Sequence, residues 1–444
     1  MRGSTGVPAV SHPGLGSDAQ QRGGVPYPYI MLASAWLFDF QASSAGQGLA
    51  IQAIYLAIYL VGLFLSALPR LGGGARISGL SLLVMLGALY LAVGTLSGLG
   101  NPNTYALARN AVGVFVYLSA AWATAKVTTE APPAKLRAVL AWLCLPYAIM
   151  MFLIYKYTAG GIDFTRVRYQ VIGASSVASL GLLVTYAAFR LSPVQLATIA
   201  LNLAILLVSV TRTFLVVLAA QGLVLLSGAR GLISRRLFVA LIGIVVLVGG
   251  AIVFGSDQLL RWQDRLGGQG QFSDRDQTVF TRMTEWQFMF ESWTQSLSNF
   301  MFGSGFNAAT QYFESMELGG RAQSTIGFGH NQHLSMLFNG GLLGGAPLLV
   351  LMTWFVIRAV RFLRAAPRAQ RPDSDIIFLG AWGATIVIGI FASDFFSASF
   401  GIRGQAMWYG IGTGLLLGAQ ARFDPANAGL YRPGPGEAIS GKTP

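Results

Sequence analysis

Long apolar stretches separated by short polar segments recur along almost the whole chain, from Ile30 to Ala421. Many of them approach the roughly 20 residues that a helix needs to cross a bilayer. The apolar residues run on without alternating with polar ones, which favours helices over the strands of a barrel. The pattern predicts about twelve transmembrane helices, at residues 28–43, 50–69, 78–98, 105–125, 138–157, 171–190, 194–210, 213–228, 237–256, 333–357, 376–395 and 405–421.

Composition indicates the same fold class. Hydrophobic residues make up 54% of the 444 residues and charged residues only 11%, whereas about 25% charged is usual in soluble proteins. A water-soluble protein of this composition would lack a polar surface. The chain is therefore predicted to be an all-α polytopic protein surrounded by membrane lipids, with a single membrane domain over residues 28–421.

The formal net charge of +13 is placed in a way that indicates membrane orientation and not nucleic-acid binding. Basic residues cluster in alternate loops, as the positive-inside rule describes. They are Arg70, Arg76, Lys126, Lys135, Arg137, Arg190, Arg230, Arg235, Arg236, Arg358, Arg361, Arg364, Arg368 and Arg371. We expect these loops and both termini to lie in the cytoplasm.

The ends of the chain differ from the membrane domain. Residues 1–27 are rich in Gly, Pro and Ser and lack the apolar core of a cleavable signal peptide. We expect them to form a disordered cytoplasmic tail, as we do residues 422–444. The single cysteine, Cys144, cannot form an intramolecular disulfide.

One loop on the opposite side of the membrane is far longer than a typical connection. It covers residues 257–332 and holds nearly half of the chain's 17 acidic residues. Within it, residues 277–300 have the pattern of an amphipathic helix. The apolar residues at helical spacing, which we expect to pack on the membrane rim or on other spans, are Phe280, Met283, Trp286, Phe290, Trp293 and Leu297.

Two of the three histidines, His330 and His333, lie where this loop enters the next span. A histidine at the water-facing mouth of a membrane helix can accept a proton near neutral pH, which suits a general base. It can equally cap the helix by hydrogen bonding. The two rings could share a helix face and a metal ion, but no third ligand is evident nearby, so no metal site is predicted.

Arginine is the second element of candidate chemistry. Arg212 lies at a turn between two apolar stretches on the outer side, where the positive-inside rule does not account for it. Its planar guanidinium suits phosphate binding, and the alternative is snorkelling to lipid headgroups. Arg282 lies on the loop helix, where pairing with Glu285 and ligand binding are both compatible with the sequence. Arg166 and Arg168 are weaker candidates in another outer loop.

The order of these elements resembles the O-antigen ligase and polymerase superfamily of bacterial envelope glycosyltransferases. The similarity is carried by His330-Asn331-x-x-Leu334, by Gly341-x-x-Gly344 in the following span, and by Gly303-Ser304-Gly305 upstream. An arginine at an outer turn and a large late loop with an arginine-bearing helix complete it. Residues 173–176 match the family's pattern only loosely, which leaves the roles of Arg166 and Arg168 open.

The resemblance implies a donor glycan on undecaprenyl pyrophosphate, bound at the periplasmic leaflet of the bacterial inner membrane. Arg212 and Arg282 are then expected to stabilise the pyrophosphate leaving group, with no metal ion or other cofactor. His330 is expected to deprotonate the acceptor hydroxyl, which attacks and inverts the anomeric carbon. Asn331 and His333 are expected to support the site, and the glycine-rich span to allow close helix packing or to accommodate the polyprenyl chain.

The sequence leaves the acceptor open. The layout of Arg212, Arg282 and His330 looks most like a ligase, which transfers the glycan to lipid A–core. A polymerase would transfer it to a growing polysaccharide, and a protein O-oligosaccharyltransferase of the same superfamily commonly carries a larger periplasmic domain. A lipid-linked glycan flippase, from a different class, would also be a basic protein of many spans, but it would not need a large outer loop that ends in His-Asn.

Overall fold

The computed structural model describes most of the membrane domain. The described residues are 49–67, 76–101, 103–158, 174–186, 189–209, 212–228, 274–313, 322–365 and 375–422. The predicted spans at 28–43 and 237–256 and both predicted tails lie outside these residues, as do Arg166 and Arg168.

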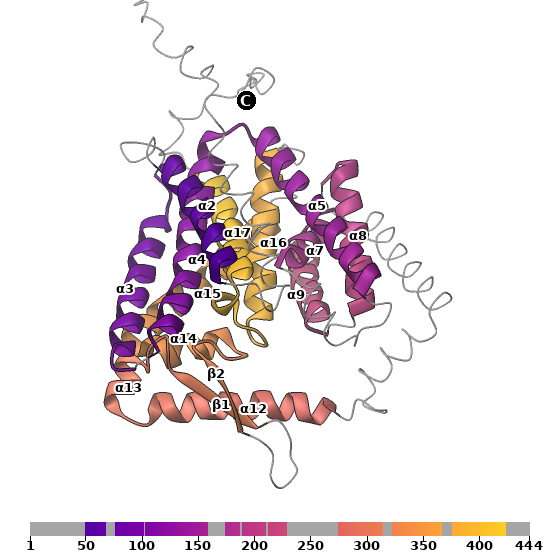
Figure 1. Ribbon diagram of the computed structural model, residues 1–444. Coiled ribbons are helices and arrows are strands. Elements are labelled where there is room, and N and C mark those ends of the chain that lie inside the picture. The colour runs from indigo at the N-terminus through magenta and orange to yellow at the C-terminus, as the bar shows by residue number, and fades with distance from the viewer. Residues whose placement is uncertain are drawn as a thin grey trace, which may run out of the picture.

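The other ten predicted spans fall on helices of the structure (Figure 1). The helices are α2 (Leu49–Ala67), α3 (Leu80–Gly98), α4 (Thr104–Glu130), α5 (Pro133–Thr158), α7 (Ala174–Tyr186), α8 (Pro193–Ser209), α9 (Arg212–Gly228), α14 (Gln332–Gly340) with α15 (Ala346–Ala365), α16 (Asp375–Ser393) and α17 (Arg403–Arg422). Among the described helices, four are long and apolar enough to cross a membrane: Leu80–Gly98, Thr104–Glu130, the run Gln332–Ala365, and Asp375–Ser393. These helices are features of a membrane protein, and the total of twelve spans stays a prediction.

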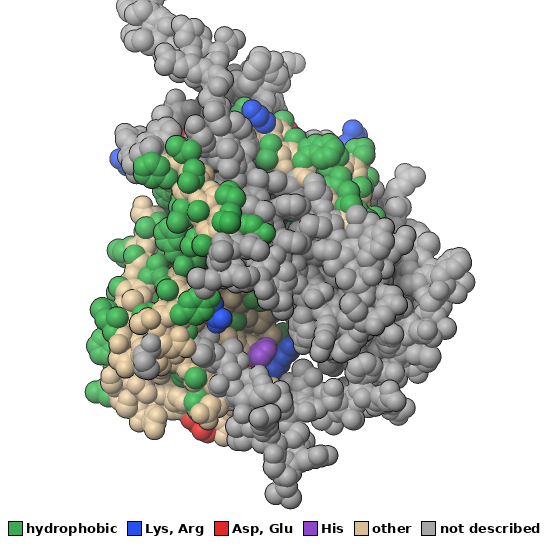
Figure 2. Space-filling model, viewed as in Figure 1, with side chains coloured by type: hydrophobic (Ala, Val, Ile, Leu, Met, Phe, Trp, Pro, Cys, Tyr) green, Lys and Arg blue, Asp and Glu red, His purple; other side chains and the backbone are tan. Residues whose placement is uncertain are grey.

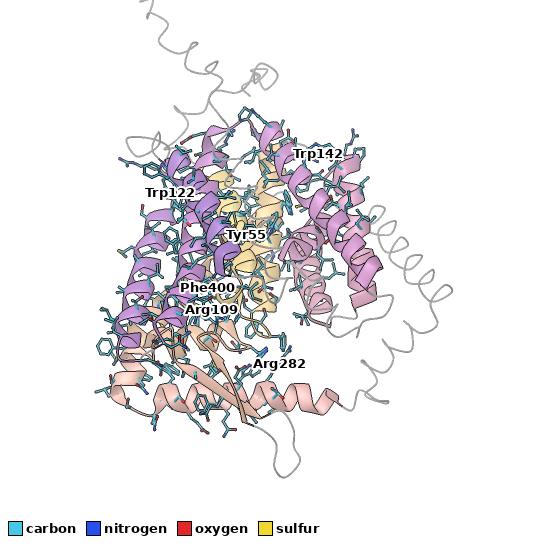
Figure 3. All side chains as sticks on the ribbon, in the orientation of Figure 1. Tyr55, Arg109, Trp122, Trp142, Arg282 and Phe400 are labelled. Carbon is cyan, nitrogen blue, oxygen red and sulfur yellow. The ribbon has the colours of Figure 1, made fainter. Side chains whose placement is uncertain are left out.

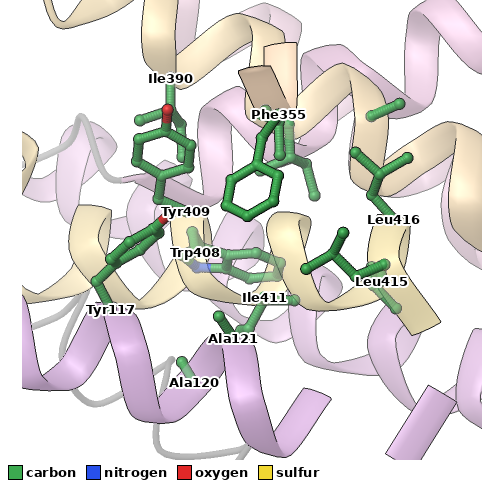
Figure 4. Close-up of a cluster of buried hydrophobic side chains, with 14 of the residues drawn as sticks. Tyr117, Ala120, Ala121, Phe355, Ile390, Trp408, Tyr409, Ile411, Leu415 and Leu416 are labelled. Atoms are coloured by element: carbon green, nitrogen blue, oxygen red, sulfur yellow. The ribbon is translucent and has the colours of Figure 1, made fainter. Parts of the chain in front are cut away.

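Helices α4 and α17 pack at the centre of the bundle in a parallel arrangement. Glycines at every fourth position of α17 allow close approach: Gly410 lies against Tyr117 and Ala120, and Gly414 against Thr124. Small residues at such spacing allow helix backbones to approach closely in membranes. Figure 4 shows the apolar cluster beside this contact, in which the rings of Tyr117 and Tyr409 are buried with their centroids 5.1 Å apart. The parallel register brings the first residues of both helices to the same end of the bundle.

The loops that the charge pattern predicts to be cytoplasmic meet at the other end. Arg137 forms an ion pair with Asp375 at 2.9 Å and also donates to the carbonyl of Arg190. At the end of α17, Arg422 donates to the carbonyl of Thr128 at 2.8 Å. These contacts join four basic loop regions at one end of the helices. Residues 274–313 and 322–332 lie at the opposite end, where α12 crosses the bundle (Figure 1).

The large loop contains helices, as predicted, and among its described residues also one short hairpin that the sequence did not predict. A helix, α12 (Asp274–Thr294), and a short helix, α13 (Leu297–Phe302), precede an antiparallel hairpin of β1 (Ala309–Phe313) and β2 (Ala322–Ile326). The predicted helix over 277–300 is broken because Ser296 takes an extended conformation and its hydroxyl caps α13, accepting from the backbone N–H of Asn299 at 3.1 Å.

The apolar stripe of α12 is only partly covered by protein. Met283 and Phe290 of the apolar stripe are 60% and 53% exposed, and Leu297 of α13 is 79% exposed. The side chains of Glu285 and Met289 are buried in their place. The polar residue Glu285 thus lies in the interior of the loop region, which sets up the site described below.

The run from α14 to α15 is interrupted by a π-helical turn at Gly341–Gly345. Gly341 has a φ of 59°, and a Cβ atom there would lie 2.5 Å from the backbone of Met301 and Gly303. The glycine-rich segment therefore permits close packing of the span against the end of α13, as one of the two sequence readings expected.

Gly341→Ala is expected to destabilise the protein by about 1–3 kcal/mol, because it combines a strained backbone with overpacking. Gly222→Ala is the matched control, since it lies within α9 with nothing within 4 Å of an added Cβ. Thermal unfolding in detergent should show a lower melting temperature for Gly341→Ala than for the wild type. The melting temperature of Gly222→Ala should equal that of the wild type. Equal melting temperatures for the two variants would contradict the packing argument.

Candidate active site

His330 lies in the turn that leads from the hairpin into α14, and its ring is hydrogen-bonded to Glu285 of α12. The His330 Nδ1 lies 2.8 Å from Glu285 Oε2. The backbone N–H of His330 donates to the same oxygen, also at 2.8 Å. The histidine side chain is 44% exposed, whereas the carboxylate is fully buried. The pair is therefore anchored inside the protein and open at the imidazole.

The Glu285 carboxylate is held in its ionised form. Its other oxygen, Oε1, accepts a hydrogen bond from the Thr310 hydroxyl at 2.8 Å. Burial raises the pKa of Glu285, but the hydrogen bonds and charge of His330, together with Thr310, lower the pKa by more, so that it lies below its ordinary value. An ionised acceptor selects the imidazole tautomer that donates from Nδ1. In that tautomer the lone pair is on Nε2, the ring nitrogen that does not face Glu285.

The turn that carries His330 is held by contacts on both sides. Gly327 has a φ of 92° and its carbonyl accepts from the Asn339 side chain at 3.0 Å. At Gly329 an added Cβ would lie 2.8 Å from Glu285 Oε1, and its backbone N–H donates to the Ser335 hydroxyl at 3.0 Å. The two glycines flanking Phe328 therefore let the chain pass close to α12 and α14, which fixes the position of the imidazole.

The side chain of Arg282 lies one turn before Glu285 on α12. Figure 3 shows it directed from α12 toward the helix bundle. Figure 2 shows a histidine beside basic side chains in a hollow of this face. The two carboxylate oxygens of Glu285 are hydrogen-bonded to Thr310 and to His330, so the carboxylate orients the histidine ring.

Residues 197–350 match the O-antigen ligase family. The match covers about a third of the chain and includes Arg212, Arg282 and His330. No curated protein matches the chain. The resemblance found in the sequence is thus confirmed for this O-antigen ligase segment.

Arg212 and His333, two other predicted site residues in the O-antigen ligase segment, have surroundings different from those of His330. Arg212 is the first residue of α9, and its side chain lies outside the described residues. His333 is buried between the rings of Phe391 and Phe395, and its Nε2 lies 3.2 Å from the carbonyl of Phe391. The rings of His330 and His333 therefore have different partners. Among the described residues, no group of three His, Cys, Asp or Glu side chains is placed to hold a metal.

Asn331 has a structural role in the O-antigen ligase segment. It is the N-cap of α14, and its side-chain oxygen accepts from the backbone N–H of Leu334 at 3.0 Å. This bond satisfies one of the unpaired donors of the first helical turn. The His-Asn sequence therefore couples an exposed imidazole to the start of a helix.

Replacing Asn331 with alanine is expected to cost about 1 kcal/mol of stability through loss of the cap. Asn331→Ser and Asn331→Asp can still cap the helix and should keep most of both stability and activity. Melting temperature and transfer rate measured together on the three variants test this role. An inactive Asn331→Asp variant that melts like the wild type would instead place Asn331 in contact with substrate.

Glu285 is the site residue that sequence reasoning missed. From the sequence, Glu285 was identified only as a possible local partner of Arg282. Its signal was an acidic residue four positions before the apolar Met289, and so on the same face of the predicted helix. The structure shows that this register is the buried one, so a carboxylate there needs a partner from elsewhere in the fold.

Proposed function

We propose that the protein is a glycosyltransferase that moves a glycan from undecaprenyl pyrophosphate to an acceptor hydroxyl at the periplasmic face of the bacterial inner membrane, most closely an O-antigen ligase acting on lipid A–core. The observation that carries the proposal is the Glu285–His330 pair, a buried carboxylate on a half-exposed imidazole, inside the O-antigen ligase segment. A carboxylate that orients a histidine for proton transfer is a recurring arrangement in group-transfer enzymes.

In the proposed reaction, His330 is the general base. The acceptor hydroxyl oxygen attacks the anomeric carbon of the donor sugar while its proton passes to His330 Nε2. The bond from the anomeric carbon to the pyrophosphate oxygen breaks, and its electron pair leaves with undecaprenyl pyrophosphate. Attack from the side opposite the leaving group inverts the anomeric centre. The Glu285 carboxylate stabilises the imidazolium that forms.

Arg282 and Arg212 are proposed to stabilise the leaving pyrophosphate. Negative charge grows on the bridging oxygen as the bond breaks, and fixed guanidinium groups lower the energy of that charge. Arg282 extends from the same helix as Glu285, one turn away, which supports a position beside the imidazole. A rigid α12 would then hold Glu285, which orients the base His330, at a fixed spacing from the leaving-group contact.

The orientation of the site supports the periplasmic location. The basic loops lie at the end of the helices opposite the His330 turn; their residues include Arg137, Arg190, Arg358 and Arg422. Basic loops remain in the cytoplasm by the positive-inside rule. The His330 end would accordingly face the periplasm, where both the donor headgroup and the acceptor are accessible.

The proposed function is tested with the purified protein in vesicles that contain undecaprenyl-pyrophosphate-linked glycan and lipid A–core. We expect glycan on lipid A–core together with release of undecaprenyl pyrophosphate. Elongation of the lipid-linked glycan would identify a polymerase instead. Movement of intact donor across the vesicle membrane without a new glycosidic bond would identify a flippase and overturn the proposal.

Deletion of the gene tests the same proposal in cells. Loss of the surface glycan ladder, with long polymer accumulating on the carrier lipid, is the outcome expected of a ligase. Single repeat units on lipid A–core would indicate a polymerase, and unchanged lipopolysaccharide with lost exopolysaccharide would indicate an exopolysaccharide polymerase.

A further inference from the structure

Two arginines outside the O-antigen ligase segment lie next to each other at the His330 end of the bundle. Arg109 is near the start of α4 and Arg403 is the first residue of α17. The carbonyl of Phe400, three residues before Arg403, packs on Gly113, one helical turn after Arg109, and Tyr105 and Arg109 both contribute to the electrostatics at Arg403. Arg109 is exposed and Arg403 is half-buried. The parallel packing of α4 and α17 brings the two side chains together.

The turn that carries His330 is attached to the elements that carry both arginines. Beside Arg109, the Asn110 side chain donates to the carbonyl of Phe306 at 2.6 Å and packs on Gly327. On the other side, the backbone N–H of Phe400 donates to the side-chain oxygen of Gln332 at 2.9 Å. The turn is therefore held between the starts of α4 and α17, and the two arginines lie on the same rigid framework as the imidazole.

Neither arginine is explained by membrane orientation, since the basic loops lie at the other end of the helices. The two guanidinium groups add positive charge near the starts of two neighbouring helices, where the helix dipoles also favour a bound anion. The guanidinium fork matches phosphate oxygens in pairs, and two arginines from different helices can contact one phosphate from two directions.

Transfer requires two substrates to meet at the imidazole, the donor and the acceptor. Under the proposed function, the donor pyrophosphate is assigned to Arg282 and Arg212. We propose that Arg109 and Arg403 form a second anion site, which binds a phosphate group of the acceptor and so positions its hydroxyl at His330 Nε2. The ligand class is a phosphate ester at the lipid–water surface, either on a phosphorylated glycolipid acceptor or on a second pyrophosphate-linked glycan.

The inference rests on the proposed function and is tested with variants of the full-length protein in vesicles. Arg109→Gln is the main variant, because the side chain is exposed and its loss should not impair folding. Arg403→Gln is the second. Arg361→Gln is the matched control, an exposed arginine near the end of α15. Lipid A–core is supplied with its phosphates or after enzymatic dephosphorylation, and donor and acceptor concentrations are varied separately.

We expect Arg109→Gln to raise the KM for phosphorylated lipid A–core by about tenfold or more, with the donor KM and kcat changed less than about twofold. Dephosphorylation of lipid A–core should raise its KM for the wild type by a similar factor and should change its KM for Arg109→Gln little. A rise in the donor KM, or a wild type indifferent to the acceptor phosphates, would overturn the inference.

If the acceptor is a second pyrophosphate-linked glycan, equilibrium binding distinguishes the two sites without turnover. The wild type should bind two equivalents of the lipid-linked unit and Arg109→Gln one, while Arg361→Gln still binds two. A single equivalent on the wild type, with no preference for phosphorylated lipid A–core, would exclude the second site. A wild type that forms no glycosidic bond with any acceptor refutes the proposed function, whereas these binding measurements decide the anion site separately.

Discussion

Replacing His330 with asparagine is expected to lower the rate of glycan transfer by about 10²–10⁴-fold, the usual contribution of a general base. The asparagine amide can donate to Glu285 in place of Nδ1, but it offers no basic nitrogen where Nε2 lies. The carboxylate therefore keeps a partner while the proton acceptor is lost. The measurement is the initial rate of transfer by purified protein in vesicles, at saturating donor and acceptor.

Folding is checked in the same samples. His330→Asn should keep the elution profile of the wild type in detergent, because the ring is half exposed and the buried carboxylate stays bonded. His330→Ala should be equally inactive and less stable, since it leaves a charged oxygen with one bond fewer. His12→Ala, the same substitution near the start of the chain, should transfer at the wild-type rate. An active His330→Asn variant would refute the general-base assignment.

The helices of the membrane domain could be predicted from the sequence because the apolar stretches approach the length of a span. At α3, α4 and α16 the predicted and observed limits agree within a few residues. Lipid imposes this correspondence, since a backbone in hydrocarbon must satisfy its own hydrogen bonds. His330 could be predicted for a different reason: its neighbours form a local motif, and the glycines and the capping asparagine all lie within the same short segment.

The interior of the large loop could not be predicted in the same way. Met283, Trp286 and Phe290 mark one apolar stripe on α12, but at the end of a membrane bundle an apolar face need not pack on protein. Periodicity therefore indicated a helix without indicating which face is buried. The hairpin was missed because its strands, Ala309–Phe313 and Ala322–Ile326, are only five residues each and are stabilised by pairing with one another.

Glu285 illustrates the limit most directly. Its partner His330 is 45 residues further along the chain, and the bond between them depends on how the hairpin and α12 pack. Only its local neighbour Arg282 is evident from sequence spacing. Arg109 and Arg403 are also distant in the sequence. They are brought together by the parallel packing of α4 and α17, which no local sequence pattern specifies.

Replacing Glu285 with glutamine should lower kcat by about 10²–10⁴-fold, since replacing the carboxylate that orients a catalytic histidine by its amide can cost about 10⁴-fold. Glutamine has the same size and can still accept from the backbone N–H of His330, but it lacks the charge that stabilises an imidazolium. The donor KM should stay near the wild-type value, because Glu285 contacts the imidazole and not the donor in the proposed mechanism. Glu291→Gln is the matched control, an exposed glutamate on the same helix.

The same pair of proteins gives a pH dependence with a definite sign. The pKa of Glu285 is lower in the folded protein than its ordinary value, so the folded state binds the proton less readily than the unfolded state. The resulting stabilisation is complete at pH values above the ordinary glutamate pKa of about 4.3 and is lost as pH falls through the lower folded value. Glu285→Gln has no such group, so the melting temperature of the wild type should fall more steeply than that of the variant on acidification. If the two curves fall in parallel below about pH 5, the carboxylate is not the ionised partner of His330 and its role in orienting the base is refuted.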